Sequence, residues 1–159
     1  MLNWIVALIP ALPLLSSVLL GFNMMAGRIG SEADEARSAG VVLSSVSMSV
    51  LLACLSLVLA QYDLISRDIL LGHWLDSGDF HVRVSLMADR LSLGLALLFS
   101  GLILLVARFS IHYLHREPGY HRFFLIINLF AGAMLCVVLG GNLLVTFLGW
   151  ELAGICSFL

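Results

Sequence analysis

Four long stretches of the chain contain no Asp, Glu, Lys or Arg, and they constrain the fold more than any other feature. They are 27, 25, 17 and 28 residues long, at Met1–Gly27, Ser38–Tyr62, Leu91–Ala107 and Phe123–Trp150. A helix needs about 20 apolar residues to cross the roughly 30 Å hydrocarbon core of a bilayer. Charged residues make up only 11% of the chain, against about 25% in soluble domains. The sequence therefore predicts an all-α polytopic membrane protein embedded in a lipid bilayer.

The first two predicted transmembrane helices form a lead-in segment over residues 1–62. They run from about Leu2 to Met25 and from about Ser38 to Tyr62. Two prolines lie inside the first helix, where a kink is expected and where neighbouring groups must satisfy the carbonyls that proline leaves free. Serines inside the second helix allow close packing and interhelical hydrogen bonds. These residues are Pro10 and Pro13 in the first helix, and Ser44, Ser45, Ser47 and Ser49 in the second.

Residues 63–88 change from a helical to a strand period. Apolar and polar residues alternate over 80–86, and Asp76-Ser77-Gly78-Asp79 just before them is a turn signal. Ile69–Trp74 can supply the partner strand. We expect a small extramembrane β-hairpin between the second and third helices.

Residues 89–159 are predicted to hold three more helices, which makes about five in all. The third runs from about Leu91 to Tyr113. Phe123–Trp150 would make a helix of about 42 Å, too long for one upright span. A break at 140–142 (Gly-Gly-Asn) gives a fourth helix, Phe123–Leu139, and a fifth that begins at Leu143. Because the sequence is still apolar at Leu159, we expect the chain to be the N-terminal part of a larger protein.

The arginines suggest an orientation and exclude one class of partner. Five lie in or near the first and third loops and three on the hairpin side, and this favours an outside N-terminus and an outside hairpin. The chain has no lysine and a net charge of −2, so no basic patch exists for nucleic acid. The two groups are Arg28, Arg37, Arg108, Arg116 and Arg122 on one side and Arg67, Arg83 and Arg90 on the other.

No metal, redox or cofactor motif is recognisable in the chain. The three cysteines lie singly in apolar stretches and are interpreted as small buried side chains. The third loop holds histidines without a spacing typical of metal ligands. A solvated loop that titrates near neutral pH and a contact with a partner subunit both fit it better. The residues are Cys54, Cys136 and Cys156, and His112, His115 and His121 with Glu117.

Glu151 is the only acidic residue inside a predicted span. It lies about 12 Å along the fifth helix, near the bilayer midplane. An ionised acid there costs roughly 2.5–3.5 kcal/mol, so such residues are usually functional. We predict that Glu151 binds and releases protons on a polar interior face. Gly154 is at i+3, and the nearby residues Gly149, Ala153 and Ser157 are small, so the helix can pack closely or admit water. A protonated glutamate that is merely hydrogen-bonded between helices is the alternative.

Arg108 and His112, late in the third span, are weaker candidates. Arg108 either extends to the inner interface or takes part in a proton path, and His112 shares that position. Asp89, just before the third helix, is either a helix N-cap or a functional acid.

The stretch 149–159 (GWELAGICSFL) resembles the fifth-helix signature of the largest antiporter-like subunit of respiratory complex I, the NADH-quinone oxidoreductase subunit L family. The resemblance extends from about residue 70 to the end of the chain. Further stretches in the family's order and spacing are Trp74 with 78–80, 89–93, 118–124 and 141–144. Arg90 departs from the family pattern, which commonly has a small residue there.

The resemblance implies that Glu151 is the membrane glutamate of a proton-translocating subunit, with a lysine partner on a later helix. It implies partner membrane subunits, no cofactor in this chain, and a place in the bacterial inner membrane. Residues 89–159 would then begin the first antiporter-like repeat. Related branches remain open as alternatives: subunits of sodium/proton antiporters, membrane-bound hydrogenases and inorganic-carbon uptake complexes. An inert assembly or scaffold fragment is a third reading.

Overall fold

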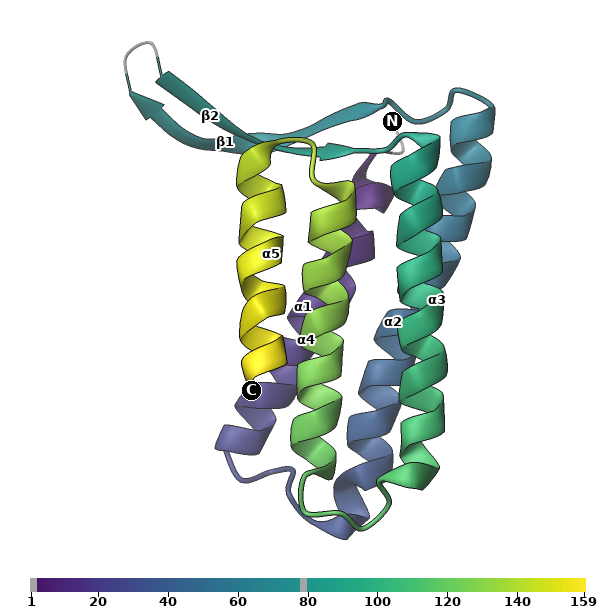
Figure 1. The fold of residues 1–159 in the computed structure, drawn as a ribbon, viewed down its shortest axis with the longest axis vertical. Helices are drawn as coiled ribbons and strands as arrows, with labels where there is room; N and C mark the ends of the chain where they lie inside the picture. Colours follow the sequence, from purple (N-terminus) through teal and green to yellow (C-terminus); the bar gives the residue numbers. More distant parts are fainter. Residues whose placement is uncertain (1–2, 78–79) are drawn as a thin grey trace.

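The computed structural model describes residues 3–77 and 80–159, and within them helices dominate. The helices stand side by side, and a two-stranded hairpin lies across one end of them (Figure 1). This confirms the predicted helical fold with a hairpin between the second and third helices. The elements are α1 (Trp4–Met25), η1 (Glu32–Asp34), α2 (Glu35–Gln61), β1 (Asp68–Ser77), β2 (Phe80–Met87), α3 (Arg90–Tyr113), α4 (Tyr120–Leu139) and α5 (Leu143–Phe158).

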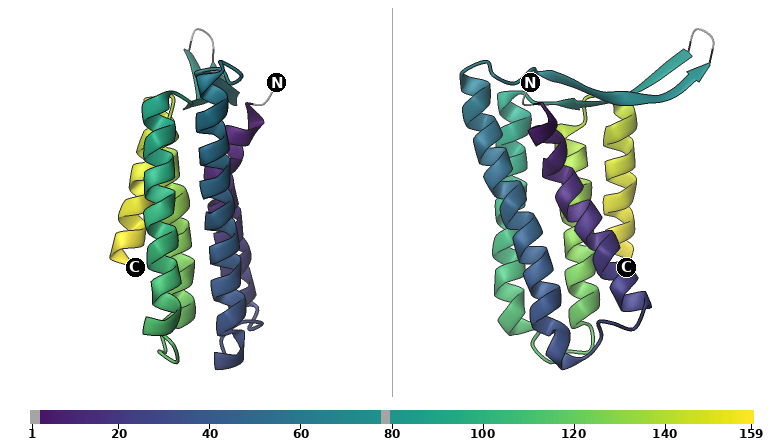
Figure 2. Two further views of the ribbon diagram at one scale, coloured as in Figure 1. Left: turned by 90° about the vertical axis from the view of Figure 1, so that its right-hand side faces the viewer. Right: turned by 180° about the vertical axis from the view of Figure 1, so that it is seen from behind.

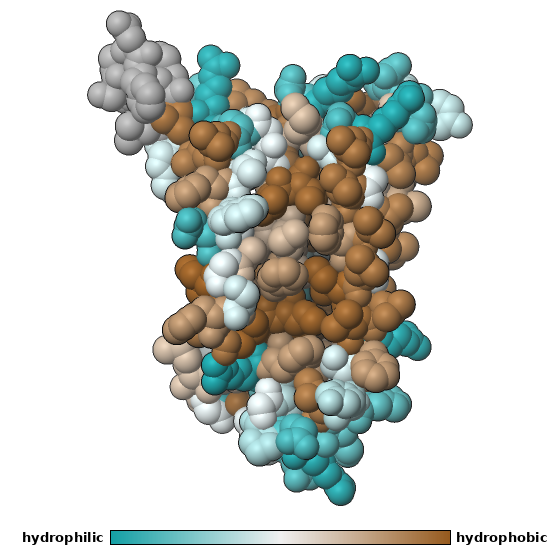
Figure 3. Space-filling view, viewed as in Figure 1, coloured by the Kyte–Doolittle hydropathy of each residue, from teal (hydrophilic) through white to brown (hydrophobic). Residues whose placement is uncertain are grey.

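Four of these helices, α1 to α4, are long and apolar enough to cross a membrane. The fifth, α5, is apolar but has 16 residues. On the face drawn in Figure 3, apolar side chains cover the middle of the molecule and polar ones gather at both ends. This distribution is the one expected of an integral membrane protein.

The helices form two layers, which are seen edge-on in the left view of Figure 2. One layer contains α1 and α2, and the other contains α3, α4 and α5. The helix α4 packs against α1, α2, α3 and α5, so it is the central element of the bundle. The helix α5 lies at the edge, where it packs against α4 and the end of β2.

A contact from α2 compensates for the hydrogen bond that is missing at Pro13 in α1. Pro13 has no N–H, which leaves the carbonyl of Ile9 without its usual helical partner. The Ser49 hydroxyl donates to that carbonyl at 2.8 Å. Ser49, one of the serines expected to bond between helices, thus supplies the hydrogen bond that Pro13 removes.

The hairpin reaches across the helix ends to the turn between α4 and α5. Its antiparallel register runs from Asp68 opposite Met87 to Ser77 opposite Phe80. The amide of Gly141 donates to the Ser85 carbonyl at 2.9 Å. Of the predicted turn, Gly78 and Asp79 lie outside the described residues, as does Leu2 of the first helix.

Two helices begin about one turn earlier than predicted. The helix α2 starts at Glu35 instead of Ser38, and α4 starts at Tyr120 instead of Phe123. Glu35 is charged yet buried, because His115 and the amide of Arg116 bind its carboxylate. Contacts from a loop some 80 residues away are not visible in a local pattern.

Candidate functional site on helix α5

The start of α5 is fixed by its own cap and by the hairpin. The Asn142 side chain accepts a hydrogen bond from the amide of Val145 at 3.0 Å and so caps the helix. A Cβ atom on Gly141 would lie 2.9 Å from backbone atoms of Ser85 and Leu86. The predicted break at residues 140–142 is therefore confirmed, and only glycine fits between the turn and β2.

Gly149 attaches the middle of α5 to α4. A Cβ atom there would lie 2.9 Å from the Ala133 carbonyl oxygen and 2.9 Å from the Val137 nitrogen. The two backbones therefore touch at this point, as small residues permit in membrane helix pairs. Gly149 is buried, so it belongs to the packed face of α5.

Glu151 lies on the opposite face of α5 and is exposed. Two residues of α-helix turn the chain by about 200°, so Glu151 points away from α4 when Gly149 points toward it. Gly154 is also exposed, with no atom within 4 Å of the Cβ position that it lacks. Of the small residues near Glu151, Gly149 therefore packs on α4, whereas Gly154 lies on the exposed side together with Glu151.

Glu151 forms no hydrogen bond or ion pair with any residue in the described parts of the chain. Its neighbours on the helix surface are apolar, with Phe147, Trp150 and Ile155 all more than half exposed. The described structure thus presents a single carboxyl group on an otherwise apolar helix face.

Arg108 and His112 lie on α3, away from Glu151. Both are exposed, and with Phe109 and Tyr113 they line a shallow pocket. The helix α4 stands between α3 and α5 in Figures 1 and 2. The bundle does not bring Arg108 or His112 to the candidate site, and their role in a proton path remains a prediction.

An amide in the middle of α4 is the polar group that the sequence analysis missed. Asn128 is fully buried and donates to the Ser16 hydroxyl at 2.7 Å and to the Pro13 carbonyl at 3.2 Å. Its side-chain oxygen accepts from the Ser45 hydroxyl at 3.0 Å. This inner polar cluster (Asn128, Ser16, Ser45 and the Pro13 carbonyl) connects α1, α2 and α4. A lone amide within an apolar run was the available signal.

Two histidines of the third loop contact the start of α2. His115 lies 2.7 Å from the Glu35 carboxylate, and His121 lies 2.7 Å from the Ser38 hydroxyl. The prediction of a solvated loop is wrong for His121, which is buried, whereas His115 is exposed although it pairs with Glu35. Over residues 3–77 and 80–159 no three His, Cys, Asp or Glu side chains gather as metal ligands would.

The structure also places two further residues named from the sequence, Asp89 at the start of α3 and Cys54 on α2. Asp89 is the N-cap of α3 and accepts from the Ser92 amide at 2.9 Å. Hydrogen bonds from the Ser92 side chain, and then from its amide, lower the pKa of Asp89. Cys54 is exposed on the surface of α2, so its predicted burial is wrong, whereas Cys156 is buried.

Comparison with known proteins shows what the chain is similar to. A family model described as "NADH-Ubiquinone oxidoreductase (complex I), chain 5 N-terminus" matches residues 74–124. The chain is 28% identical to NAD(P)H-quinone oxidoreductase chain 5 of Synechocystis over 96% of its length, and 41% identical to NADH-quinone oxidoreductase subunit L of Escherichia coli over 54%. It is 33% identical to NADH-ubiquinone oxidoreductase chain 5 of Talaromyces marneffei over 93%.

The chain is thus similar to the N-terminal part of complex I chain 5 proteins. It spans 22%, 14% and 22% of the lengths of these three relatives. The resemblance stated from the motifs is thereby confirmed, and with four candidate spans the chain is an integral membrane protein. The matched segment, residues 74–124, covers the end of β1, all of β2 and α3, and the start of α4.

Proposed function

We propose that this chain is a proton-translocating membrane subunit of a complex I-type NADH:quinone oxidoreductase and that Glu151 carries the proton. The observation that supports this most directly is the single exposed carboxyl group on the apolar outer face of α5. In a membrane, such a group must be neutral, hydrated or paired with an opposite charge. The family supplies the setting, since its members are subunits of quinone oxidoreductases.

The proton occupancy of Glu151 would be controlled by a second charge. The family resemblance implies a lysine on a later helix, and an opposite charge within about 4–6 Å favours the ionised carboxylate. Approach of the lysine would therefore promote proton release, and its withdrawal would promote proton uptake. The packed contact at Gly149 holds α5 against α4, so the lysine, and not the glutamate, would be the moving partner.

The deciding experiment replaces Glu151 by Gln in the complete protein within its assembled complex. Gln keeps the size of the side chain and removes the ionisable proton, so we expect quinone-linked proton pumping to fall at least tenfold while the amount of assembled complex is unchanged. Glu117→Gln is the matched control, because Glu117 is exposed on the loop before α4. Normal pumping by an assembled Glu151→Gln complex would refute the proposed role.

We further propose that the N-terminus and the hairpin face the outside of the membrane, and that other membrane subunits of the complex contact this chain. The five arginines near the loops that connect α1 to α2 and α3 to α4, against three near the hairpin, support this orientation. A cysteine at exposed Asp68, in a chain whose own cysteines are replaced, should react with a membrane-impermeant maleimide added from outside. Labelling only after the membrane is opened would reverse the orientation.

A further inference from the structure

A pocket of about 330 Å³ opens where α2 ends, α3 begins and the hairpin starts. Its apolar wall includes Ile65 and Ala88, both buried. Three charged side chains around the opening, those of Asp63, Arg67 and Arg90, are exposed. The pocket is far from Glu151, so an inference about it is independent of the proton pathway.

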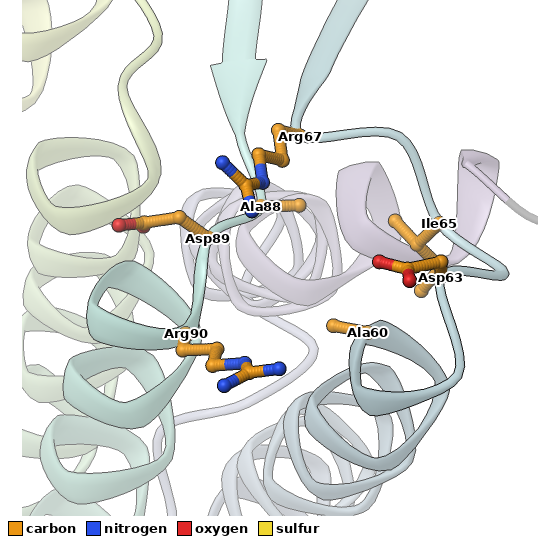
Figure 4. A pocket seen from close by; sticks show the side chains of 7 residues that line it. All are labelled: Ala60, Asp63, Ile65, Arg67, Ala88, Asp89 and Arg90. Carbon is orange, nitrogen blue, oxygen red and sulfur yellow. The ribbon is translucent and has the colours of Figure 1, made fainter.

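The charged groups around this pocket are not paired with one another. Figure 4 shows the Arg90 guanidinium reaching across the opening toward Ala60 and the Arg67 guanidinium lying over Ala88. The Asp63 carboxylate is turned toward the same opening. None of these three charges forms an ion pair with another group in the described residues.

The fourth charged residue at the pocket, Asp89, is already engaged. Its carboxylate accepts the Ser92 amide as the N-cap of α3, and in Figure 4 it points away from the opening. The charge available to a ligand is therefore that of two guanidinium groups and one carboxylate.

The pocket lies at the level where a spanning helix meets the lipid headgroups. The spans α2 and α3 end and begin beside it, and the aromatic residues Trp4 and Tyr62 are 60% and 73% exposed at the same end of the bundle. Exposed Trp and Tyr are typical of the membrane interface. A ligand that reaches this pocket from the bilayer would arrive headgroup first.

Exposed apolar side chains lie on α2 and α3, the two helices that meet at the pocket. On α2, Leu55 and Val58 are exposed seven and four residues before Tyr62, and on α3 the exposed residues Leu91 and Leu98 are seven apart. Residues at these spacings lie on one side of a helix. Each helix thus presents an apolar surface to the acyl chains of the lipids that surround it.

We propose that this pocket binds the headgroup of a zwitterionic phospholipid, phosphatidylethanolamine. Its phosphate would be held by Arg67 and Arg90, and its ammonium group by Asp63. A guanidinium presents two parallel N–H groups that match phosphate oxygens. Asp63 distinguishes this lipid from phosphatidylglycerol, which would offer the carboxylate a neutral glycerol in place of the ammonium group.

The proposal is tested on the complete protein, purified with its complex, stripped of lipid and titrated with phosphatidylethanolamine while native mass spectrometry counts bound lipid. The double variant Arg67→Gln/Arg90→Gln should bind phosphatidylethanolamine at one site at least tenfold more weakly than wild type does. The matched control is Arg28→Gln/Arg83→Gln, which removes two exposed arginines elsewhere and should bind as wild type does. Equal binding by both double variants would overturn the proposal.

Two further arms identify the ligand. Asp63→Asn should reduce the preference for phosphatidylethanolamine over phosphatidylglycerol, and Ala60→Phe should weaken binding by filling the opening without changing charge. Inorganic phosphate at millimolar concentration should leave the lipid bound. Displacement of the lipid by inorganic phosphate would show a site for soluble anions, and an unchanged preference in Asp63→Asn would remove the carboxylate from the site; either result would refute the lipid assignment as stated.

Discussion

Asn128 in α4 and Glu151 in α5 are both polar residues within apolar helices, but their surroundings differ. Asn128 is fully buried, and its amide is bound by groups from α1 and α2. Glu151 is exposed on the outer face of the bundle and has no partner in the described residues. The difference suggests how to separate structural from functional polar groups in such a chain. A group that is satisfied locally stabilises the packing, whereas an unsatisfied one needs a partner from another element.

Replacing Asn128 should have the largest effect on stability. Asn128→Leu keeps the side-chain volume and removes three hydrogen bonds, each worth about 0.6 kcal/mol in membrane helices, so the free energy of unfolding should fall by about 2 kcal/mol. Ser44→Ala is the control, since Ser44 is exposed and bonds only within its own helix. Denaturant unfolding of the complete protein in bicelles measures both. Equal losses for the two variants would show that the inner polar cluster adds no stability.

A pair of glycine variants tests the two faces of α5 with a smaller effect. Gly149→Ala places a methyl group 2.9 Å from the backbone of α4 and should cost about 1–2 kcal/mol by overpacking. Gly154→Ala has open space around it and should change stability by less than about 0.5 kcal/mol. Thiol labelling of buried Cys156 reports whether α5 has moved. Faster labelling in Gly154→Ala than in Gly149→Ala would reverse the assignment of the faces.

The smallest expected effect on stability is at the start of α3. Asp89 caps this helix, as Asn142 caps α5. Because hydrogen bonds from Ser92 lower the pKa of Asp89, its ionised form stabilises the folded state. That stabilisation is fully present above the ordinary value of 3.8 and is lost as the pH falls through the lowered value.

Asp89→Asn should keep the cap and remove this part of the pH dependence, whereas Asp89→Ala should cost about 1 kcal/mol at neutral pH. Thermal unfolding of the complete protein between pH 3 and pH 7 measures both effects. An Asp89→Asn variant that loses stability with acid as steeply as wild type would show that other groups account for the acid sensitivity.

Most of the fold was predictable because it follows from local chemistry. The uncharged stretches indicated the helices, the period-two alternation indicated the hairpin, and the excessive length of Phe123–Trp150 required the break at Gly140. The early start of α2 was not predictable. It depends on a buried Glu35 whose partners His115 and Arg116 come from the far loop, and one sequence alone does not reveal such a pairing.

The role of Glu151 stays a prediction from the sequence, and the surroundings of Glu151 could not be predicted from it. An acid within an apolar run identifies Glu151, but which neighbours share its face depends on where α5 touches α4. The contact at Gly149 determines how α5 is rotated about its own axis. A glycine within an apolar run does not indicate from the sequence which way it will face. Asn128 was missed for the same kind of reason, since its partners lie on two other helices.

The contact between the hairpin and the α4–α5 turn has a consequence for the order of folding. Ser85 accepts the Gly141 amide, and Leu86 pairs with Gly140, although more than 50 residues separate them. Synthesis proceeds from the N-terminus, so residues 68–87 leave the ribosome before residues 140–142 do. The strand that receives the turn is therefore already made when the turn arrives. The turn that leads into α5, the helix that carries Glu151, then docks onto β2, which has already been made.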